Sequence, residues 1–252
     1  MSLPPVAMPT ERRTTLLLNG AELLTVQTTP VHLDDWAVGF LYTEGLIQSI
    51  TDIETLTTDL PGARVSATIA PEKVAALDIP TQRYLTSGCG KGVTFSSIKD
   101  AMLLQPVGHD LTVAPGQLLA WIRQMQRQSP LYSESGGMHA AAVVHTETEE
   151  LIVREDIGRH NAVDKAIGAA LKAGWPPERV VLLTSGRISY EMCAKAARYG
   201  AGVAASLTAA TDQAIRLANR LGLDLVGYVR KEERMLLYTE GRRIAGSETA
   251  GR

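Results

Sequence analysis

The second half of the chain alternates short apolar runs with amphipathic segments. The apolar runs predict strands, and the segments with an apolar residue at every third or fourth position predict helices. The predicted strands are residues 140–144, 151–154, 180–183, 203–207, 223–230 and 235–238, and the predicted helices are about 162–171, 192–199 and 211–221. Strands that alternate with helices of this length need crossover connections, so the pattern predicts an α/β fold whose sheet is covered by helices on both faces.

The first part of the chain has a different pattern. Apolar runs at 16–18 and 22–27 surround Asn19-Gly20, a strong signal for a β-hairpin with a two-residue turn. Another strand is expected at 65–69. Together with the helix described next, these elements predict a small α+β unit.

We expect a helix that is capped by Asp34 or Asp35 and continues as far as Leu46 and Ile47. Two glycines, at positions 39 and 45, fall inside this predicted helix and lower its helix propensity. Close packing of another element against the helix would explain why they are there.

Two further helices are expected between these parts, at 96–104 and 115–128. We therefore expect a smaller N-terminal α+β domain at residues 13–108 and a larger α/β domain at 109–246. The chain ends, residues 1–12 and 247–252, are expected to be disordered.

Composition narrows the class of protein. The 252 residues carry a formal charge of −2, which gives no electrostatic reason to expect nucleic-acid or membrane-surface binding. Aromatic residues make up 5%, too few for a stacking platform for single-stranded nucleic acid. No apolar stretch approaches the ~20 residues of a membrane span, and the N-terminus lacks the features of a signal peptide. We expect a cytoplasmic protein.

The two cysteines lie in very different surroundings. Cys89 falls in the run Thr86-Ser87-Gly88-Cys89-Gly90-Lys91-Gly92, where glycines permit close approach of another molecule and a lysine favours the reactive thiolate. The alternative is a turn that holds a small buried residue. Cys193 lies in an apolar helical segment and is expected to be core. Two such thiols make neither a disulfide framework nor a thiolate metal site, so we expect no metal.

Polar clusters follow two of the predicted strands. The first, residues 154–161, includes Arg159 and His160, and its composition fits a phosphate-binding site and a solvated junction with internal ion pairs about equally well. The second, residues 184–189, includes Ser185 and Arg187 before a helix, an arrangement that favours an anion site. His139, a lone histidine before a strand, is expected to be structural.

The last polar segment follows the predicted strand at 223–230. It consists of Tyr228, Val229, Arg230, Lys231, Glu232 and Glu233. A tyrosine and an arginine at a sheet end can hold a nucleobase and a phosphate. An ordinary hairpin between two strands explains the same residues equally well.

Taken together, these segments resemble the FdhD family, sulfurtransferases that are accessory to formate dehydrogenase. The resemblance covers nearly the whole chain after residue 15. Its most specific carrier is the block from Arg154 to Lys165, and the others are residues 39–45, the Cys89 segment, and residues 137–141, 184–191 and 225–230.

The resemblance implies a cytidine-deaminase-like fold for the larger domain. It implies that Cys89 accepts persulfide sulfur from a cysteine desulfurase and passes it to the molybdenum bis(molybdopterin guanine dinucleotide) cofactor that formate dehydrogenase needs. It further implies that Tyr228 to Glu233 bind this cofactor. From the polar clusters described above, we expect Ser185, Arg187, Arg159 and His160 to contribute to the same site. Apo formate dehydrogenase would be a partner, and a homodimer is expected.

The chain departs from the family pattern at two places. Many members have two cysteines in the Cys-Gly-x-Cys-Gly loop, whereas this chain has one, so a two-cysteine relay is excluded. Ala210 stands where relatives often have proline, which affects rigidity more than chemistry.

Two other functions are alternatives to sulfur transfer. The implied fold suggests a zinc deaminase, but the Pro-Cys-x-x-Cys motif that holds zinc in those enzymes is absent. The second is a chaperone that binds the molybdenum cofactor and delivers it without sulfur chemistry. The single loop cysteine keeps this second alternative open.

Overall fold

The computed structural model describes residues 8–71, 84–85, 93–94, 104–108 and 110–246. Its larger sheet has six strands in the order β12-β11-β10-β9-β7-β8. The strands are β7 (His139–His145), β8 (Leu151–Asp156), β9 (Val180–Thr184), β10 (Val203–Ser206), β11 (Asp224–Gly227) and β12 (Leu236–Leu237). Strands β9, β10 and β11 are parallel, β7 is antiparallel to both β8 and β9, and β12 is antiparallel to β11.

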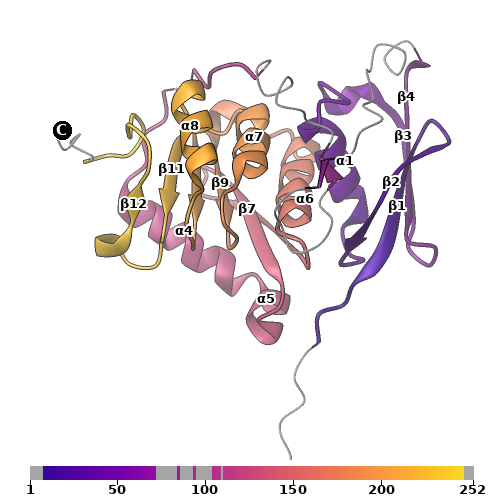
Figure 1. The fold of residues 1–252 in the computed structure, drawn as a ribbon, viewed down its shortest axis with the longest axis horizontal. Coiled ribbons are helices and arrows are strands. Elements are labelled where there is room, and N and C mark those ends of the chain that lie inside the picture. Colours follow the sequence, from indigo (N-terminus) through magenta and orange to yellow (C-terminus); the bar gives the residue numbers. More distant parts are fainter. Residues whose placement is uncertain (1–7, 72–83, 86–92, 95–103, 109, 247–252) are drawn as a thin grey trace, which may run out of the picture.

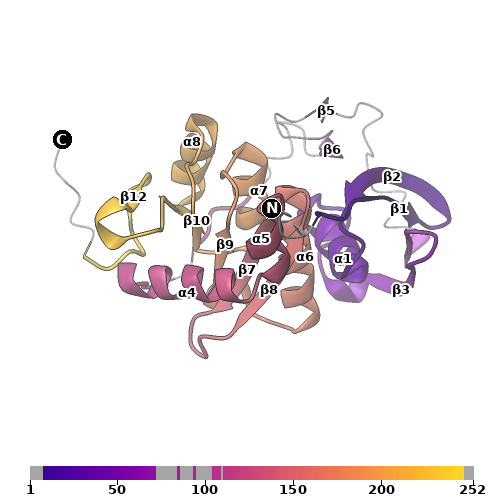
Figure 2. The ribbon, with the colours of Figure 1, turned by 90° about the horizontal axis from the view of Figure 1, so that it is seen from below.

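Helices cover both faces of this sheet, as predicted (Figure 2). Helices α6 (Arg159–Lys172), α7 (Tyr190–Tyr199) and α8 (Asp212–Leu221) pack on one face, and α4 (Pro115–Arg127) packs on the other. A short helix, α5 (Pro130–Ser135), follows α4. Alanine and valine dominate the strand core: every residue from Ala140 to Val144 is fully buried.

The N-terminal unit is a four-stranded sheet in the order β2-β1-β4-β3 with one helix on it (Figure 1). Its elements are β1 (Arg12–Leu18), β2 (Ala21–Thr28), α1 (Leu33–Thr43), β3 (Ile53–Asp59) and β4 (Arg64–Ile69). Asn19 and Gly20 both have positive φ, as the predicted hairpin turn requires. The Asn19 side chain also binds the backbone of Ile69 and so ties this turn to β4.

Helix α1 lies between the N-terminal sheet and α6 (Figure 1). The two helices approach backbone to backbone. A Cβ added to Gly39 would lie 1.8 Å from the carbonyl oxygen of Asp164, and one added to Gly168 would lie 1.9 Å from that of Asp35. The close packing expected at position 39 is therefore confirmed, and α6 is the element that packs there.

Three expectations for α1 and its surroundings differ from the structure. The N-cap is His32, so Asp34 and Asp35 lie in the first turn. The helix ends at Thr43, and Gly45, with φ of 76°, lies beyond it together with Leu46 and Ile47. Strand β1 begins at Arg12, the last residue of the expected disordered end.

The predicted strand at 223–230 is too long at its end. Strand β11 stops at Gly227, and Tyr228 turns into the left-handed region with φ of 53°. Strand β3 and helix α5 were not predicted. Short 3₁₀ helices, also not predicted, lie at η1 (Ile50–Asp52), η2 (Pro177–Arg179) and η3 (Glu232–Arg234).

Two short strands, β5 (Tyr84–Leu85) and β6 (Val93–Thr94), pair antiparallel. Cys89 belongs to residues 86–92 between them, which lie outside the described residues, as does most of the helix predicted at 96–104. Within the described part of the chain, no helix is both long and apolar enough to cross a membrane. The division at residues 108 and 109 stays a prediction, although Val107 packs in the core of the larger unit.

Candidate functional site

The predicted site segments meet at one edge of the larger sheet. Because β7 is antiparallel to both of its neighbours, β8 runs in the same direction as β9, β10 and β11. The ends of these four strands therefore lie at the same edge, where β7 begins with His139. Helices α6, α7 and α8 start from this edge, an arrangement that is typical of ligand sites in α/β sheets.

Five residues from three of these segments form what we call the strand-end cluster: His139, Arg159, His160, Ser185 and Gly186. The Ser185 hydroxyl lies 3.3 Å from Nδ1 of His139 and accepts a hydrogen bond from the backbone N–H of Ala140. A Cβ added to Gly186 would lie 3.0 Å from Cβ of Arg159 and 3.3 Å from Nδ1 of His139. The His139 and Arg159 side chains therefore both lie against Gly186, and a side chain at that position would crowd them.

Both histidines of the cluster are held in the neutral form. Burial, followed by the nearby Arg159 guanidinium, lowers the pKa of His139. The same two causes lower the pKa of His160 to about 3. Nε2 of His160 is buried and has no hydrogen-bond partner within the described part of the chain. The cluster thus brings a buried guanidinium and two uncharged imidazoles together.

The segment after β11 lies beside the end of β10. The backbone N–H of Tyr228 donates to the carbonyl of Thr208, and that of Val229 donates to the carbonyl of Ser206. Val229 is fully buried, whereas the Tyr228 side chain is 39% exposed. Nε of Arg230 donates to the carbonyl of Leu207 at 3.1 Å. Val229 therefore anchors the segment and leaves its aromatic ring at the surface.

Tyr238 adds a second phenol to this place. A Cβ on Gly227 would lie 2.5 Å from the Tyr238 ring, so the ring packs directly on the strand end. Burial raises the pKa of Tyr238, and the neighbouring Tyr228 contributes in the same direction. The backbone of Ala210 acts on this pKa in the opposite direction.

The charged residues predicted for ligand binding differ from Arg159 in their exposure. Arg187, Lys231, Glu232 and Glu233 are all exposed, and none of them forms a salt bridge with another described residue. Their side chains are available to a ligand.

The rest of the block from Arg154 to Lys165 serves mainly to join the two units. Arg154 pairs with Asp35 of α1 at 2.7 Å, and the fully buried Lys165 and Asp156 pair at 2.6 Å. Thr29, which follows β2, donates its N–H to Asp156 and accepts from Lys165. For these residues the structure favours internal ion pairs over ligand binding.

A second buried group of charges lies under α1. Lys195 of α7 contacts Glu44 and Asp164, each at 2.9 Å, and hydrogen-bonds the Thr43 hydroxyl. Burial raises the pKa of Asp164 to about 6, although Lys195 acts in the opposite direction. Burial lowers the pKa of Lys195, but the two carboxylates more than offset it and the pKa is raised. We refer to α1, α6 and these two buried charge groups together as the buried interface.

Cys193 is core, as predicted. It is fully buried on α7, and burial raises its pKa to about 12, which leaves almost no thiolate at neutral pH. Cys89, the other cysteine, lies outside the described residues. Within the residues that are described, no three His, Cys, Asp or Glu side chains are placed to hold a metal ion.

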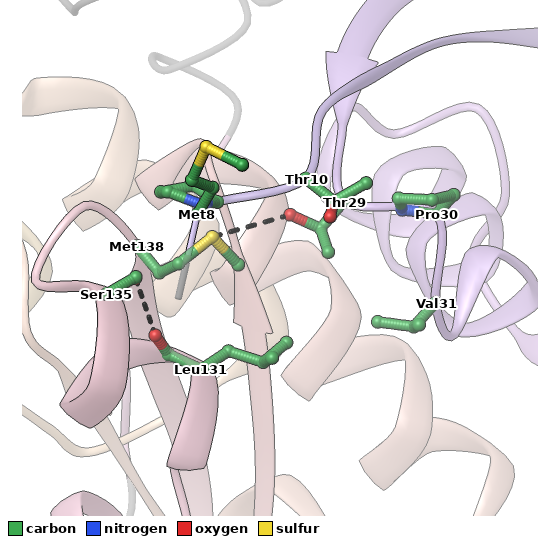
Figure 3. A pocket seen from close by; sticks show the side chains of 9 residues that line it. Met8, Thr10, Thr29, Pro30, Val31, Leu131, Ser135 and Met138 are labelled. Atoms are coloured by element: carbon green, nitrogen blue, oxygen red, sulfur yellow. Dashed lines mark hydrogen bonds between the residues drawn. The ribbon is translucent and has the colours of Figure 1, made fainter. Parts of the chain in front are cut away.

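A separate pocket of about 200 Å³ lies where the N-terminal segment crosses the larger unit (Figure 3). Its walls come from residues 8–10, 29–31, Leu131, Ser135 and Met138. The Thr29 hydroxyl donates to the Met138 sulfur at 3.7 Å. The walls are mainly apolar, and none of the predicted site residues contributes to them.

Comparison with known proteins identifies the family. The model of the FdhD/NarQ family matches residues 9–245. The chain belongs to this family. It is 36% identical over 238 residues to the sulfur carrier protein FdhD of Bacillus subtilis, which covers 94% of this chain and 90% of the relative. It is 35% identical over 240 residues to the protein of the same name from Staphylococcus haemolyticus, with 95% and 90% covered.

A solved structure has the same fold as this FdhD/NarQ chain. It is a putative formate dehydrogenase accessory protein from Desulfotalea psychrophila, with a TM-score of 0.76 and 25% identity. The match covers 94% of this chain and 90% of that one. The mixed α/β architecture is thereby confirmed, while the narrower cytidine-deaminase-like assignment stays a prediction.

Sequence reasoning missed two residues that the fold brings to the site. His139 reaches Ser185 because β7 pairs with β9, and the two residues are 46 positions apart in the chain. Tyr238 reaches the end of β11 because the chain turns back after η3. The only local signal for His139 was its position after Gly136-Gly137, directly before a buried strand.

Proposed function

We propose that this protein carries sulfur on Cys89, from a cysteine desulfurase to the molybdenum bis(molybdopterin guanine dinucleotide) cofactor of formate dehydrogenase. The observation that supports it most is the family of the chain, taken together with the surroundings of its two cysteines. Relatives that align over nearly the whole chain are named sulfur carrier proteins. Of the two cysteines in the chain, Cys193 is buried and protonated, which leaves Cys89 to hold the sulfur.

The first step is a thiol–persulfide exchange. The Cys89 thiolate attacks the terminal sulfur of the desulfurase persulfide and a new S–S bond forms. The old S–S bond breaks, and its electron pair leaves on the desulfurase thiolate. The exchange needs no external oxidant or reductant.

The second step delivers the terminal sulfur to the molybdenum. With the metal entering as Mo(IV), the Cys89 S–S bond breaks and the departing sulfur takes two electrons from the metal. The product is a sulfido ligand on Mo(VI), and the Cys89 thiol is regenerated with its proton. Cys89 is then ready for another persulfide, so the protein acts as a sulfurtransferase.

The cofactor is bound at the carboxyl ends of the strands in this proposal. The exposed Tyr228 ring stacks on a guanine base, and Glu232 or Glu233 accepts hydrogen bonds from its N–H groups. Arg187, Arg230 and Lys231, with Ser185, Arg159 and His160, face the phosphates. This placement accounts for exposed arginines at strand ends in a chain of net charge −2.

The partners belong to the same proposal. They are a cysteine desulfurase, apo formate dehydrogenase and a second copy of this chain, all in the cytoplasm. Analytical ultracentrifugation of the full chain tests the homodimer.

Replacement of Cys89 with alanine separates sulfur transfer from a chaperone role. The Cys89→Ala protein is expected to bind the cofactor with unchanged affinity and to fail to activate apo formate dehydrogenase. Cys193→Ala is the matched control and is expected to retain activation. Full activation by Cys89→Ala would contradict sulfur transfer and favour a chaperone that only delivers the cofactor.

A further inference from the structure

We propose that His139 is a ligand-binding residue that donates a hydrogen bond from Nε2 to a phosphate oxygen of the bound nucleotide, and that Ser185 is the positioning residue that fixes this tautomer. The inference rests on the proposed function only for the identity of the ligand. The tautomer follows from contacts within the strand-end cluster.

The direction of the Ser185 hydroxyl hydrogen follows from its neighbours. The backbone N–H of Ala140 donates to the Ser185 oxygen at 3.0 Å, so this contact does not use the hydroxyl hydrogen. Nδ1 of His139, at 3.3 Å, is the one acceptor for that hydrogen among the described residues. A nitrogen that accepts a hydrogen bond carries no proton, so the proton of the neutral imidazole resides on Nε2.

The charges around His139 keep it neutral. Burial is the largest effect that lowers its pKa, and the Arg159 guanidinium acts in the same direction. Asp156 opposes them, but it is already paired with Lys165. His160, the remaining titratable neighbour in the cluster, is itself neutral. The imidazole is therefore a neutral donor across the physiological pH range.

Gly186 sets the relative position of His139 and Arg159. A Cβ added to Gly186 would meet Cβ and Cδ of Arg159 and Nδ1 of His139, so the two side chains border the same β9–α7 turn. The charge of Arg159 also acts on the His139 imidazole. A phosphate that binds Arg159 beside this turn would therefore lie near His139. Nε2 of His160, in the same cluster, is buried and has no hydrogen-bond partner among the described residues. A polar group of a bound ligand would supply this partner.

The tautomer is tested by NMR on the full chain with isotope-labelled histidine nitrogens. The expected spectrum shows His139 protonated at Nε2 in the wild type. Ser185→Ala is expected to give a mixture of tautomers, and Ser185→Thr, which keeps the hydroxyl, is expected to restore the wild-type spectrum. A His139 protonated at Nδ1 in the wild type, or a Ser185→Ala spectrum identical to the wild type, would overturn the positioning role.

Ligand binding is tested in the same samples with GDP and with guanosine, which has the base and sugar but no phosphate. The His139 Nε2 signal is expected to move with GDP and to stay in place with guanosine. Equal shifts with both compounds, or none with either, would overturn the phosphate contact. This measurement uses the unaltered protein and does not depend on any variant folding.

Calorimetry with GDP supplies the functional readout. His139→Leu is expected to weaken GDP binding by roughly tenfold, the size of one hydrogen bond to a charged acceptor. His139→Gln places an amide N–H near the position of Nε2 and is expected to recover most of this loss. Equal loss in both variants would contradict a role for the Nε2 donor. A negative result for the His139 variants would contradict the His139 contact and would not affect the proposal that Cys89 transfers sulfur. Activation of formate dehydrogenase by Cys89→Ala would contradict sulfur transfer and would not affect the His139 contact.

Discussion

The buried interface and the ends of the strands use their charged residues in opposite ways, and the block from Arg154 to Lys165 contributes to both. At the buried interface each charge meets an opposite charge inside the protein, as Asp156 does with Lys165. At the strand ends Arg187 and Lys231 are exposed and form no salt bridge within the described part of the chain. Local composition alone did not distinguish these two uses.

The difference shows what buried polar residues accomplish in this fold. A buried charge is tolerated only with a partner and hydrogen bonds, because its desolvation is costly. The block therefore fixes the N-terminal unit to the larger sheet, and this also fixes the start of α6, where Arg159 and His160 lie. In the proposed function, the strand ends supply the groups that bind the ligand.

Lys165→Ala is expected to have the largest effect on stability. It leaves the Asp156 carboxylate buried without its cation, so the free energy of unfolding should fall by about 3–5 kcal/mol. Urea unfolding followed by circular dichroism measures it. The control is Arg216→Ala, which removes an exposed partner of Asp212 and should cost about 0–1 kcal/mol. Equal losses in the two variants would contradict the contrast between buried and exposed charges.

The second prediction concerns pH and the Asp164 carboxyl. Its pKa is about 6 in the folded protein against 3.8 as the ordinary value, so the folded state keeps a proton that the unfolded state releases. The contribution of this carboxyl to stability should therefore decline as the pH rises from about 4 to about 6. The unfolding free energy of wild type minus that of Asp164→Asn should decline over this window.

Asp212→Asn is the control for this measurement, because the Asp212 side chain is exposed. This variant shows what the loss of one surface carboxyl does over the same pH window. A difference for Asp164→Asn that increases with pH would mean that Lys195 outweighs burial at Asp164.

Arg187→Ala is expected to leave stability almost unchanged, within about 0.5 kcal/mol, because the side chain is exposed and unpaired with described residues. It should weaken GDP binding by roughly tenfold, since it removes a guanidinium from the proposed phosphate site. Thermal unfolding and calorimetry give the two values. A loss of stability with normal GDP binding would place Arg187 with the structural residues.

Much of the larger unit was predictable because its strands and helices carry local patterns. The runs at 140–144 and 180–183 are buried strands, as predicted. The end of β11 was not predictable, because the apolar run continues through Val229. The chain turns at Tyr228, where the Tyr238 ring packs on Gly227. The apolar pattern of the strand itself does not show this contact.

The same limit applies to the candidate site. Ser185 and Arg187 were identified from a local strand–turn–helix pattern. His139 was expected to be structural, because its contact with Ser185 depends on the pairing of β7 with β9. Asp34 and Asp35 were expected to cap α1, but Asp35 pairs with Arg154 and Lys172, which lie far away in the chain.

The most direct test of sulfur carriage is peptide mass spectrometry after incubation of the protein with a cysteine desulfurase and cysteine. The account predicts the added mass of one sulfur atom on the peptide that contains Cys89, removed by a reducing agent, and none on the peptide that contains Cys193. Sulfur on Cys193, or on neither peptide while formate dehydrogenase is still activated, would contradict it.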